Sequence, residues 1–339
     1  MTTIIAEAGV NHNGDIELAK KLVDVAADAG VDYVKFQTFK SNKLVSPFAQ
    51  KAIYQIKNDD NKEDESQLNM LKKLELTEEN HIELIAHCKS KNIKFFSTAF
   101  DQESILYLYS LNLDIFKIPS GELTNFPYLK AIGKTKLPVI LSTGMAKLSE
   151  IDKAINILIS YGTNKNKITV LHCSTEYPTP MIDVNLKAML TIKESLDVAV
   201  GYSDHTLGIE VPIAAVAMGA TVIEKHFTLD RNLNGPDHKA SLEPYELKEM
   251  VKSIRNIEKA ISGNGVKEPS NSEKKNIIIT RKSIHSSRFL KSGTIIKDSD
   301  IISLRPGDGI CSMEWETIIG KKLNKDIDKY SKLSYNDFL

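Results

Sequence analysis

The sequence is poor in cysteine, has no long apolar run and carries no net charge, and each of these features excludes a class of protein. Its three cysteines, Cys88, Cys173 and Cys311, are odd in number and far apart. This argues against a disulfide framework or a paired-cysteine metal site and favours a reducing cytoplasm. No segment approaches the roughly eighteen apolar residues of a membrane span, and no basic segment precedes the first apolar run, so neither a membrane-spanning nor an exported protein is expected. The 44 basic and 44 acidic residues leave no net field to attract nucleic acid, which is not expected as a partner.

What the sequence does contain is an alternation of short β-branched or aromatic runs with longer stretches whose apolar residues have helical spacing. Eight runs are expected to be strands: 3–9, 32–39, 93–100, 114–121, 138–144, 167–175, 198–205 and 221–229. Eight strand–helix pairs in about 260 residues predict an α/β fold, the closed (β/α)8 TIM barrel. A doubly wound open sheet is the alternative, but it more often has fewer units and a GxGxxG motif after its first strand, which GVNHNG does not match.

Polar residues lie at the carboxyl end of each of the eight runs. In a barrel of this type the active site lies at the carboxyl ends of the strands, and the strand interiors pack as layers of apolar side chains. The polar residues at the strand ends are therefore expected to converge on one mouth of the barrel. They are Glu7, Lys35, Gln37, Ser97, Thr98, Lys117, Ser120, Ser142, His172, Ser174, Thr175, Ser203, Asp204, His205, Glu224 and His226.

Two of these residues suggest a metal site. His205 and His226 are expected to end neighbouring strands, whose backbones lie about 4.8 Å apart, so that two imidazoles share one divalent ion. With oxygen donors in the other positions, the ion would stay open to water and substrate, as in a catalytic site. Mn²⁺ suits such a mixed ligand set, with Mg²⁺, Co²⁺ and Zn²⁺ as alternatives. The competing interpretation is that each is a core histidine bonded to a neighbouring carboxylate.

Two lysines suggest an anion site. Lys35 and Lys117 lie inside otherwise apolar runs, where an unpaired ammonium group is costly, so each is expected to meet an anion. Glu7 or Glu224 could serve this purpose structurally. Together with the nearby hydroxyl groups, the two lysines favour a site for a phosphate and a carboxylate. An aldolase that forms a Schiff base through one lysine is the competing function.

Eight segments carry a family resemblance, and they occur in the order IAEAGVNHNG, VKFQTF, FKIPSGELTNFPYL, ILSTGMA, LHCSTEYPTP, GYSDHT, EKHFTLD and GPDHKAS. In this order and spacing they resemble the bacterial sialic acid synthase family, which includes N-acetylneuraminate and legionaminate synthases. The resemblance covers essentially the whole chain. It implies a catalytic barrel over residues 1–262, a polar linker over 263–276 and a small C-terminal antifreeze-like (SAF) domain of β-clip fold over 277–339.

The resemblance also implies an activity and roles for individual residues. The family consists of transferases that condense phosphoenolpyruvate with an N-acetylated hexosamine in its open-chain aldehyde form. His205 and His226 match the metal ligands, Glu7 is the candidate for moving the proton of an activated water, and Glu224 and Asp204 are expected to orient the imidazoles. Residues that match phosphoenolpyruvate contacts are Lys35, Thr98, Lys117, Ser120, Ser142 and Ser203. Residues that match positions around the sugar are Glu7, Gln37, Tyr177, Asp237 and, from the small domain of the partner subunit, Arg305. Thr175 replaces an Asn of some members, so a phosphate contact there is expected to be weaker or absent.

The acceptor sugar is not fixed by the sequence. N-acetylmannosamine, which gives N-acetylneuraminate, is the first expectation, and 2,4-diacetamido-2,4,6-trideoxymannose, which gives a legionaminate, is the alternative. A trideoxy sugar would need an apolar pocket for its methyl group and a partner for its extra acetamido group, and residues 41–70 are the expected lid. The family pattern implies a domain-swapped homodimer. A catalytically silent sugar-binding protein is a further alternative, although such a protein has no use for two buried lysines beside two histidines.

Overall fold

The computed structural model describes residues 1–52, 55–56 and 66–339. Two compact units make up the chain, Met1–Ser262 and Gly263–Leu339. Within the described ranges, no helix is both long enough and apolar enough to cross a membrane.

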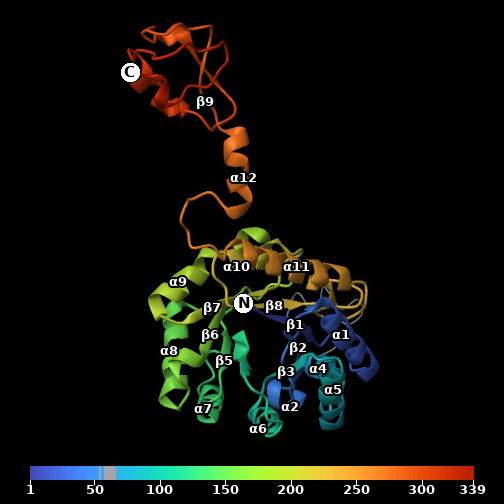
Figure 1. The fold of residues 1–339 in the computed structure, drawn as a ribbon. Coiled ribbons are helices and arrows are strands. Elements are labelled where there is room, and N and C mark those ends of the chain that lie inside the picture. Colours follow the sequence, from blue (N-terminus) through green and yellow to red (C-terminus); the bar gives the residue numbers. More distant parts are fainter. Residues whose placement is uncertain (53–54, 57–65) are drawn as a thin grey trace. The chain divides into compact units, whose positions relative to one another are not determined.

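The first unit is a closed barrel of eight parallel strands in sequential order, in which the eighth strand pairs with the first. Its strands are β1 (Thr3–Gly9), β2 (Tyr33–Thr38), β3 (Lys94–Ala99), β4 (Phe116–Ile118), β5 (Val139–Ser142), β6 (Ile168–His172), β7 (Ala199–Asp204) and β8 (Val222–His226). Each strand lies within the run expected from the sequence, so the predicted (β/α)8 barrel is confirmed. Figure 1 shows helices around the outside of the strands.

Helices follow the strands and cover the barrel. Those of the first unit are α1 (Ile16–Ala29), α2 (Ser41–Leu44), α4 (Gln67–Lys72), α5 (Glu78–Ser90), α6 (Gln102–Ser110), α7 (Phe126–Thr135), α8 (Leu148–Ser160), α9 (Lys187–Leu196), α10 (Glu210–Ala217) and α11 (Pro244–Ala260). The first of them shows why the sequence folds in this way. Asp15 caps the amino end of α1 by accepting from the backbone N–H groups of Glu17 and Leu18. Gly30 ends the helix with a φ of 77°, a left-handed conformation that glycine adopts without steric cost.

Strand alternation positions the site. Five buried apolar side chains form a small cluster of their own, distinct from the large core between strands and helices: Ile5, Phe96, Ile140, Leu171 and Val222. Two residues further along the same strands, or just past their ends, come residues that line one cavity: Glu7, Thr98, Ser142, Cys173 and Glu224. Because residues i and i+2 of a strand face the same side, the apolar cluster lies one layer below the polar residues of the mouth.

The second unit has its own small core. It contains α12 (Asn271–Thr280), the antiparallel pair β9 (Ser283–Ser286) and β10 (Ile301–Leu304), and α13 (Trp315–Ile318). Its buried apolar residues are Ile284, Leu290, Ile296, Ile301, Ile310, Ile318, Leu323, Ile327 and Leu333. Trp315 packs against this core while half-buried, and its indole N–H donates to Asp298.

Part of the expected linker is helical. Residues 271–276, expected to belong to a polar linker, are helical and open α12. The helix begins there because the Ser270 side chain accepts from the backbone N–H of Glu273, while the Glu273 side chain accepts from the backbone N–H of Ser270. This reciprocal capping box satisfies two backbone donors that would otherwise lack partners.

Candidate active site

A cavity of about 650 Å³ opens at the carboxyl ends of the barrel strands. It brings together fourteen of the residues expected to form the site, from all eight strands and the loops that follow them: Glu7, Lys35, Gln37, Thr98, Lys117, Ser120, Ser142, Thr175, Tyr177, Ser203, His205, Glu224, His226 and Asp237. Arg305 belongs to the second unit, where it is exposed and donates from Nε to the carbonyl of Thr280.

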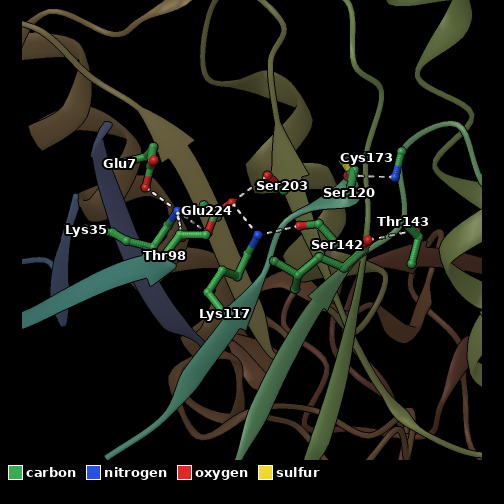
Figure 2. Close-up of polar contacts among 12 residues, drawn as sticks. Glu7, Lys35, Thr98, Lys117, Ser120, Ser142, Thr143, Cys173, Ser203 and Glu224 are labelled. Atoms are coloured by element: carbon green, nitrogen blue, oxygen red, sulfur yellow. Dashed lines mark hydrogen bonds and ion pairs between the residues drawn. The ribbon is translucent and has the colours of Figure 1, made fainter. Parts of the chain in front are cut away.

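Lys35, on β2, is enclosed by acceptors. Its Nζ lies 2.5 Å from Glu7 Oε2 and 3.4 Å from Glu224 Oε2, and it donates to Thr98 Oγ1 at 3.0 Å. Figure 2 shows these partners pointing at the ammonium group, and they come from β1, β3 and β8. Burial acts to lower the pKa of Lys35, but Glu224 and Glu7 raise it above its ordinary value. Lys35 is therefore a buried cation.

Lys117, on β4, shares one of these carboxylates. Its Nζ donates to Ser142 Oγ at 2.7 Å and lies 3.5 Å from Glu224 Oε1. Burial lowers the pKa of Lys117, and although Glu224 acts against this effect, the value stays below the ordinary one. Glu224 thus lies between the two lysines and contacts one with each oxygen (Figure 2).

The two buried carboxyl groups differ in ionisation. Burial raises the pKa of Glu7 to about 7, although Lys35 acts to lower it. Burial acts in the same direction on Glu224, but Lys117 and Lys35 lower its pKa to about 2. The Ser203 hydroxyl also donates to Glu224 at 2.8 Å and stabilises the charged form. Glu224 is thus ionised at neutral pH while Glu7 can gain or lose a proton there, and such a divergence separates acid–base roles in enzymes.

The two expected metal ligands lie side by side. His226 ends β8 and His205 follows β7, with 5.4 Å between their ring centroids. Tyr177 packs against both rings, at 4.0 Å from that of His205 and 5.6 Å from that of His226. Burial lowers the pKa of His205 to about 4 and that of His226 well below its ordinary value. Both imidazoles are therefore neutral at physiological pH, the state in which histidine binds metals.

The hydrogen bonds of the two histidines fit a metal site that keeps free coordination positions better than one in which protein ligands fill every position. The Nδ1 of His205 bonds the carbonyl of Ser174, which leaves Nε2 with a lone pair. The Nδ1 of His226 is buried without a hydrogen-bond partner in the described part of the chain, and Asp237 Oδ2 is 3.8 Å away. No group of three or more His, Cys, Asp or Glu side chains that could hold a metal occurs among the described residues. The pair suits an ion whose other ligands are oxygens of water and substrate.

The expectation that Asp204 and Glu224 orient the imidazoles is wrong. Asp204 pairs with Lys225 at 2.6 Å, with both side chains fully buried, and it also accepts from Thr206. Glu224 bonds Ser203 and the two lysines, as described above. For Asp204 the reason is strand alternation, because it and its neighbour His205 face opposite sides of the barrel wall. For Glu224 the reason is that Ser203 and the two lysines already engage its carboxylate. The backbone carbonyl of Ser174 has the expected role for His205.

Other residues of the mouth are held through hydroxyl and thiol groups. Ser120 Oγ accepts from the backbone N–H of Gly144 at 2.9 Å and lies 3.3 Å from Cys173 Sγ. Cys173 is buried. Gln37 donates to Glu7 at 3.4 Å, and Thr175 lines the wall half-buried.

The sequence did not predict which residues form one side of the cavity. It is formed by Val10, Leu44, Val45, Met70, Leu71, Leu74 and Phe100, here called the apolar wall, together with Gln55 and Gln67. Most of these residues come from the segment between β2 and β3, which includes residues 41–70, the range expected to form a lid; within that range residues 53–54 and 57–65 lie outside the described residues. Its helices α2 and α4 are too short to give a clear periodic signal.

Comparison with known proteins decides the family. The model of the NeuB family matches residues 22–267, more than half of the chain. The chain belongs to the NeuB family. A model of the SAF domain matches residues 281–338 of this family member, so the small C-terminal domain expected from the sequence is confirmed as an SAF domain.

Two curated relatives of this NeuB family member carry the same description. The chain is 55% identical over 325 residues to the N,N'-diacetyllegionaminic acid synthase of Campylobacter jejuni, and the match covers 96% of each chain. It is 49% identical over 326 residues to the N,N'-diacetyllegionaminic acid synthase of Legionella pneumophila, with 96% of this chain and 91% of the relative covered. The relatives are synthases, and this family member is likewise an enzyme.

A solved structure agrees with the fold. The N-acetylneuraminic acid synthetase of Leptospira borgpetersenii, crystallised with citrate, is 38% identical to this NeuB family member and superposes with a TM-score of 0.70. The match covers 81% of this chain and 90% of that one.

Proposed function

We propose that this enzyme is an N,N'-diacetyllegionaminic acid synthase. It condenses phosphoenolpyruvate with the open-chain aldehyde of 2,4-diacetamido-2,4,6-trideoxymannose and water, and it releases phosphate and a nine-carbon 2-keto acid. Both relatives with this description match almost the full chain. They favour the diacetamido sugar over N-acetylmannosamine, the first expectation from the sequence. The proposal revises that expectation while keeping the same reaction.

The observation that carries the proposal is the buried pair of lysines beside two neutral imidazoles in one cavity. Lys35 and Lys117 supply two positive charges, and ionised Glu224 supplies one negative charge. Because burial raises the pKa of Glu7, this carboxyl group compensates the charge of the lysines less fully than Glu224 does. Two buried ammonium groups with hydroxyl donors suit a small anion that carries both a phosphate and a carboxylate, such as phosphoenolpyruvate.

Each residue of the cavity has its own role in the proposed reaction. Lys35, with Thr98, and Lys117, with Ser142, bind and orient the phosphate and carboxylate of phosphoenolpyruvate. C3 of phosphoenolpyruvate forms the new bond to the aldehyde carbon, and water adds at C2. Glu7 accepts one proton of that water, which its raised pKa permits near neutral pH, and returns it to the former aldehyde oxygen, which becomes a hydroxyl group. The hydroxyl group at C2 then gives its proton to the phosphate as the C2–O bond to phosphate breaks and leaves the keto group, and the lysines stabilise the departing phosphate.

A divalent ion completes the proposal. His205 and His226 would hold it, with Mn²⁺ the preferred ion and Mg²⁺ or Co²⁺ as alternatives. When bound, the ion supplies Lewis-acid polarisation of the aldehyde oxygen.

The test is an assay of the purified protein with phosphoenolpyruvate, Mn²⁺ and either sugar, in which phosphate release and product are both quantified. We expect phosphate and product in equal amounts, with a higher kcat/KM for the diacetamido sugar. Trapping of pyruvate on a lysine by borohydride, without use of phosphoenolpyruvate, would instead establish the Schiff-base aldolase.

Metal removal gives an independent prediction. Chelation should abolish turnover, added Mn²⁺ should restore it, and His226→Ala should be inactive with or without metal. Metal binding is checked directly by titration calorimetry of the apoprotein, in which His226→Ala should lose the tight site. A His226→Ala protein that keeps wild-type turnover after chelation would contradict the metal assignment.

The assembly and location are also proposals. We expect a homodimer with exchanged SAF domains in the cytoplasm, in which Arg305 of one chain reaches the sugar bound by its partner. Light scattering of the purified protein tests the dimer. Mixing Arg305→Ala with His226→Ala subunits tests the exchange, because only crossed sites would regain activity.

A further inference from the structure

The active-site cavity has two chemically different sides. One side carries the lysines, carboxylates and histidines, and the other is the apolar wall. Three members of the apolar wall, Met70, Leu71 and Leu74, come from α4 or just after it and are buried. A sugar held by its aldehyde end at the histidines presents its far carbons to some other part of the cavity. The apolar wall is suited to methyl groups there and unsuited to hydroxyl groups, which would lose their hydrogen bonds to water.

Two amide side chains interrupt the apolar surroundings. Gln55 and Gln67 both line the cavity, and only 9% of the Gln55 residue surface is exposed. Gln55 Oε1 accepts from the backbone N–H of Ala52 at 2.9 Å and from Gln67 Nε2 at 3.4 Å. The first bond fixes the orientation of the Gln55 amide, and the second joins it to α4. A buried amide held in place by the backbone is a suitable element for recognition, because little rotamer entropy is lost when a ligand binds.

An amide is also the complement of an acetamido group. Such a group has one N–H donor, one carbonyl acceptor and a methyl group, whereas a hydroxyl group has no methyl. A glutamine pair can meet the donor and the acceptor, while the adjacent apolar wall covers the methyl. Hydrogen-bonding sites of this kind discriminate strongly against analogues that lack the group, because their own polar atoms are then left unpaired.

We propose that Gln55, with Gln67, forms hydrogen bonds with the second acetamido group of the acceptor sugar. The apolar wall packs against the methyl group of that acetamido and against the methyl group at the deoxygenated C6. This inference rests on the proposed function and assigns its sugar specificity to described residues between β2 and β3. Gln55 acts as a specificity residue and takes no part in the bond-forming steps.

The test combines one variant with two sugars. Gln55→Glu keeps an oxygen for the Ala52 N–H and the Gln67 amide, so the local fold is retained, but it replaces the amide donor by a carboxylate. The sugars are the diacetamido trideoxymannose and 2-acetamido-2,6-dideoxymannose, which carries a hydroxyl at C4 and is otherwise the same. Asn69→Ala is the matched control, because Asn69 is exposed on α4 and does not line the cavity. Thermal unfolding of each protein shows whether it is folded.

For Gln55→Glu we expect kcat/KM for the diacetamido sugar to fall about 10- to 100-fold. For the C4-hydroxyl sugar, and for the KM of phosphoenolpyruvate, the change should stay within about threefold. Asn69→Ala should match the wild type with both sugars. Equal losses on both sugars, or no loss on either, would overturn the inference.

The outcomes also separate this inference from the proposed function. If the wild type releases no phosphate with the diacetamido sugar, the proposed function fails and the inference fails with it. If the wild type is active and the ratio of the two sugars does not change in Gln55→Glu, the inference alone fails. If that variant does not fold, Gln67→Glu, at the half-buried start of α4, is measured against the same criterion.

Discussion

Two glutamates of the same cavity show how strongly neighbours decide the chemistry of a residue. Glu7 and Glu224 are both buried and both contact Lys35, yet the pKa of one is about 7 and that of the other about 2. The difference follows from Lys117 and Ser203, which contact Glu224 only. The sequence identifies both glutamates as residues of the mouth, but it does not tell which of them stays ionised.

Glu7→Gln tests the proton-transfer role. In the proposed reaction the ionised carboxylate of Glu7 accepts the proton, so wild-type kcat/KM should rise with pH through about 7 and be low below that value. Without this group, kcat should fall about 100-fold or more, and the step in the pH profile should disappear. The measurement is the pH dependence of phosphate release, with Glu316→Gln, exposed in the second unit, as control. A variant that keeps the wild-type pH step would show that another group accepts the proton.

Single residues were predictable where the chain alternates regularly. Strand periodicity places His205 and His226 at adjacent strand ends, and the structure brings their rings together. The same periodicity, applied to Asp204, would have excluded it as a partner of His205, since adjacent strand residues face opposite sides. Gln55 carries no such signal, because the cavity reaches it only through tertiary folding.

Whole elements were predictable according to their length and burial. The eight strands are short apolar runs between long helical stretches, so both periodicities are visible in the sequence. Two short helices, α2 and α4, were not predicted, because four and six residues give too few turns for a periodic pattern. The start of α12 was signalled by Ser270 and Glu273, whose spacing is that of a capping box, within a segment that is otherwise polar.

A buried ion pair between β7 and β8 gives a prediction about the stability of the barrel. Lys225 and Asp204 form a fully buried ion pair, and Lys225 also donates to the carbonyl of Thr206. Lys225→Met leaves the Asp204 carboxylate buried without its cation, so the free energy of unfolding should fall by about 3–5 kcal/mol. Denaturant unfolding measures this loss. The double variant with Asp204→Asn should recover part of it, and an unchanged midpoint in Lys225→Met would contradict the importance of the pair.

At the scale of the whole molecule, the chain has two cores that can be followed separately. The only tryptophan of the sequence, Trp315, packs against the core of the second unit and therefore reports on the SAF domain. Near the end of that domain, the buried Asp337 accepts from the backbone N–H of Ser334 at 2.8 Å and pairs with Lys325 at 2.6 Å. Burial acts to raise the pKa of Asp337, but the bonds from Lys325 and Ser334 lower it below its ordinary value.

Asp337→Asn should therefore destabilise the SAF domain in a pH-dependent way. A lowered pKa means that the carboxylate stabilises the fold above its ordinary pKa of about 4, and that this contribution is lost as the pH falls through the folded value. We expect a loss of about 1–2 kcal/mol at pH 7 that shrinks in acid. Thermal unfolding followed by tryptophan fluorescence at several pH values measures it, with the exposed Asp328→Asn as control. A loss that is the same at all pH values would show that charge is not its cause.

The place of Glu224 between the two lysines has a consequence for the end of the catalytic cycle. Two ammonium groups without a counter-ion would bind inorganic phosphate tightly, and the bound phosphate would then block the next molecule of phosphoenolpyruvate. Because a carboxylate of the chain itself already contacts both ammonium groups, it would compete with phosphate for them in the proposed reaction. In the proposed reaction, this internal counter-ion would favour phosphate release, so fast turnover would depend on an acidic residue that need not touch the new carbon–carbon bond.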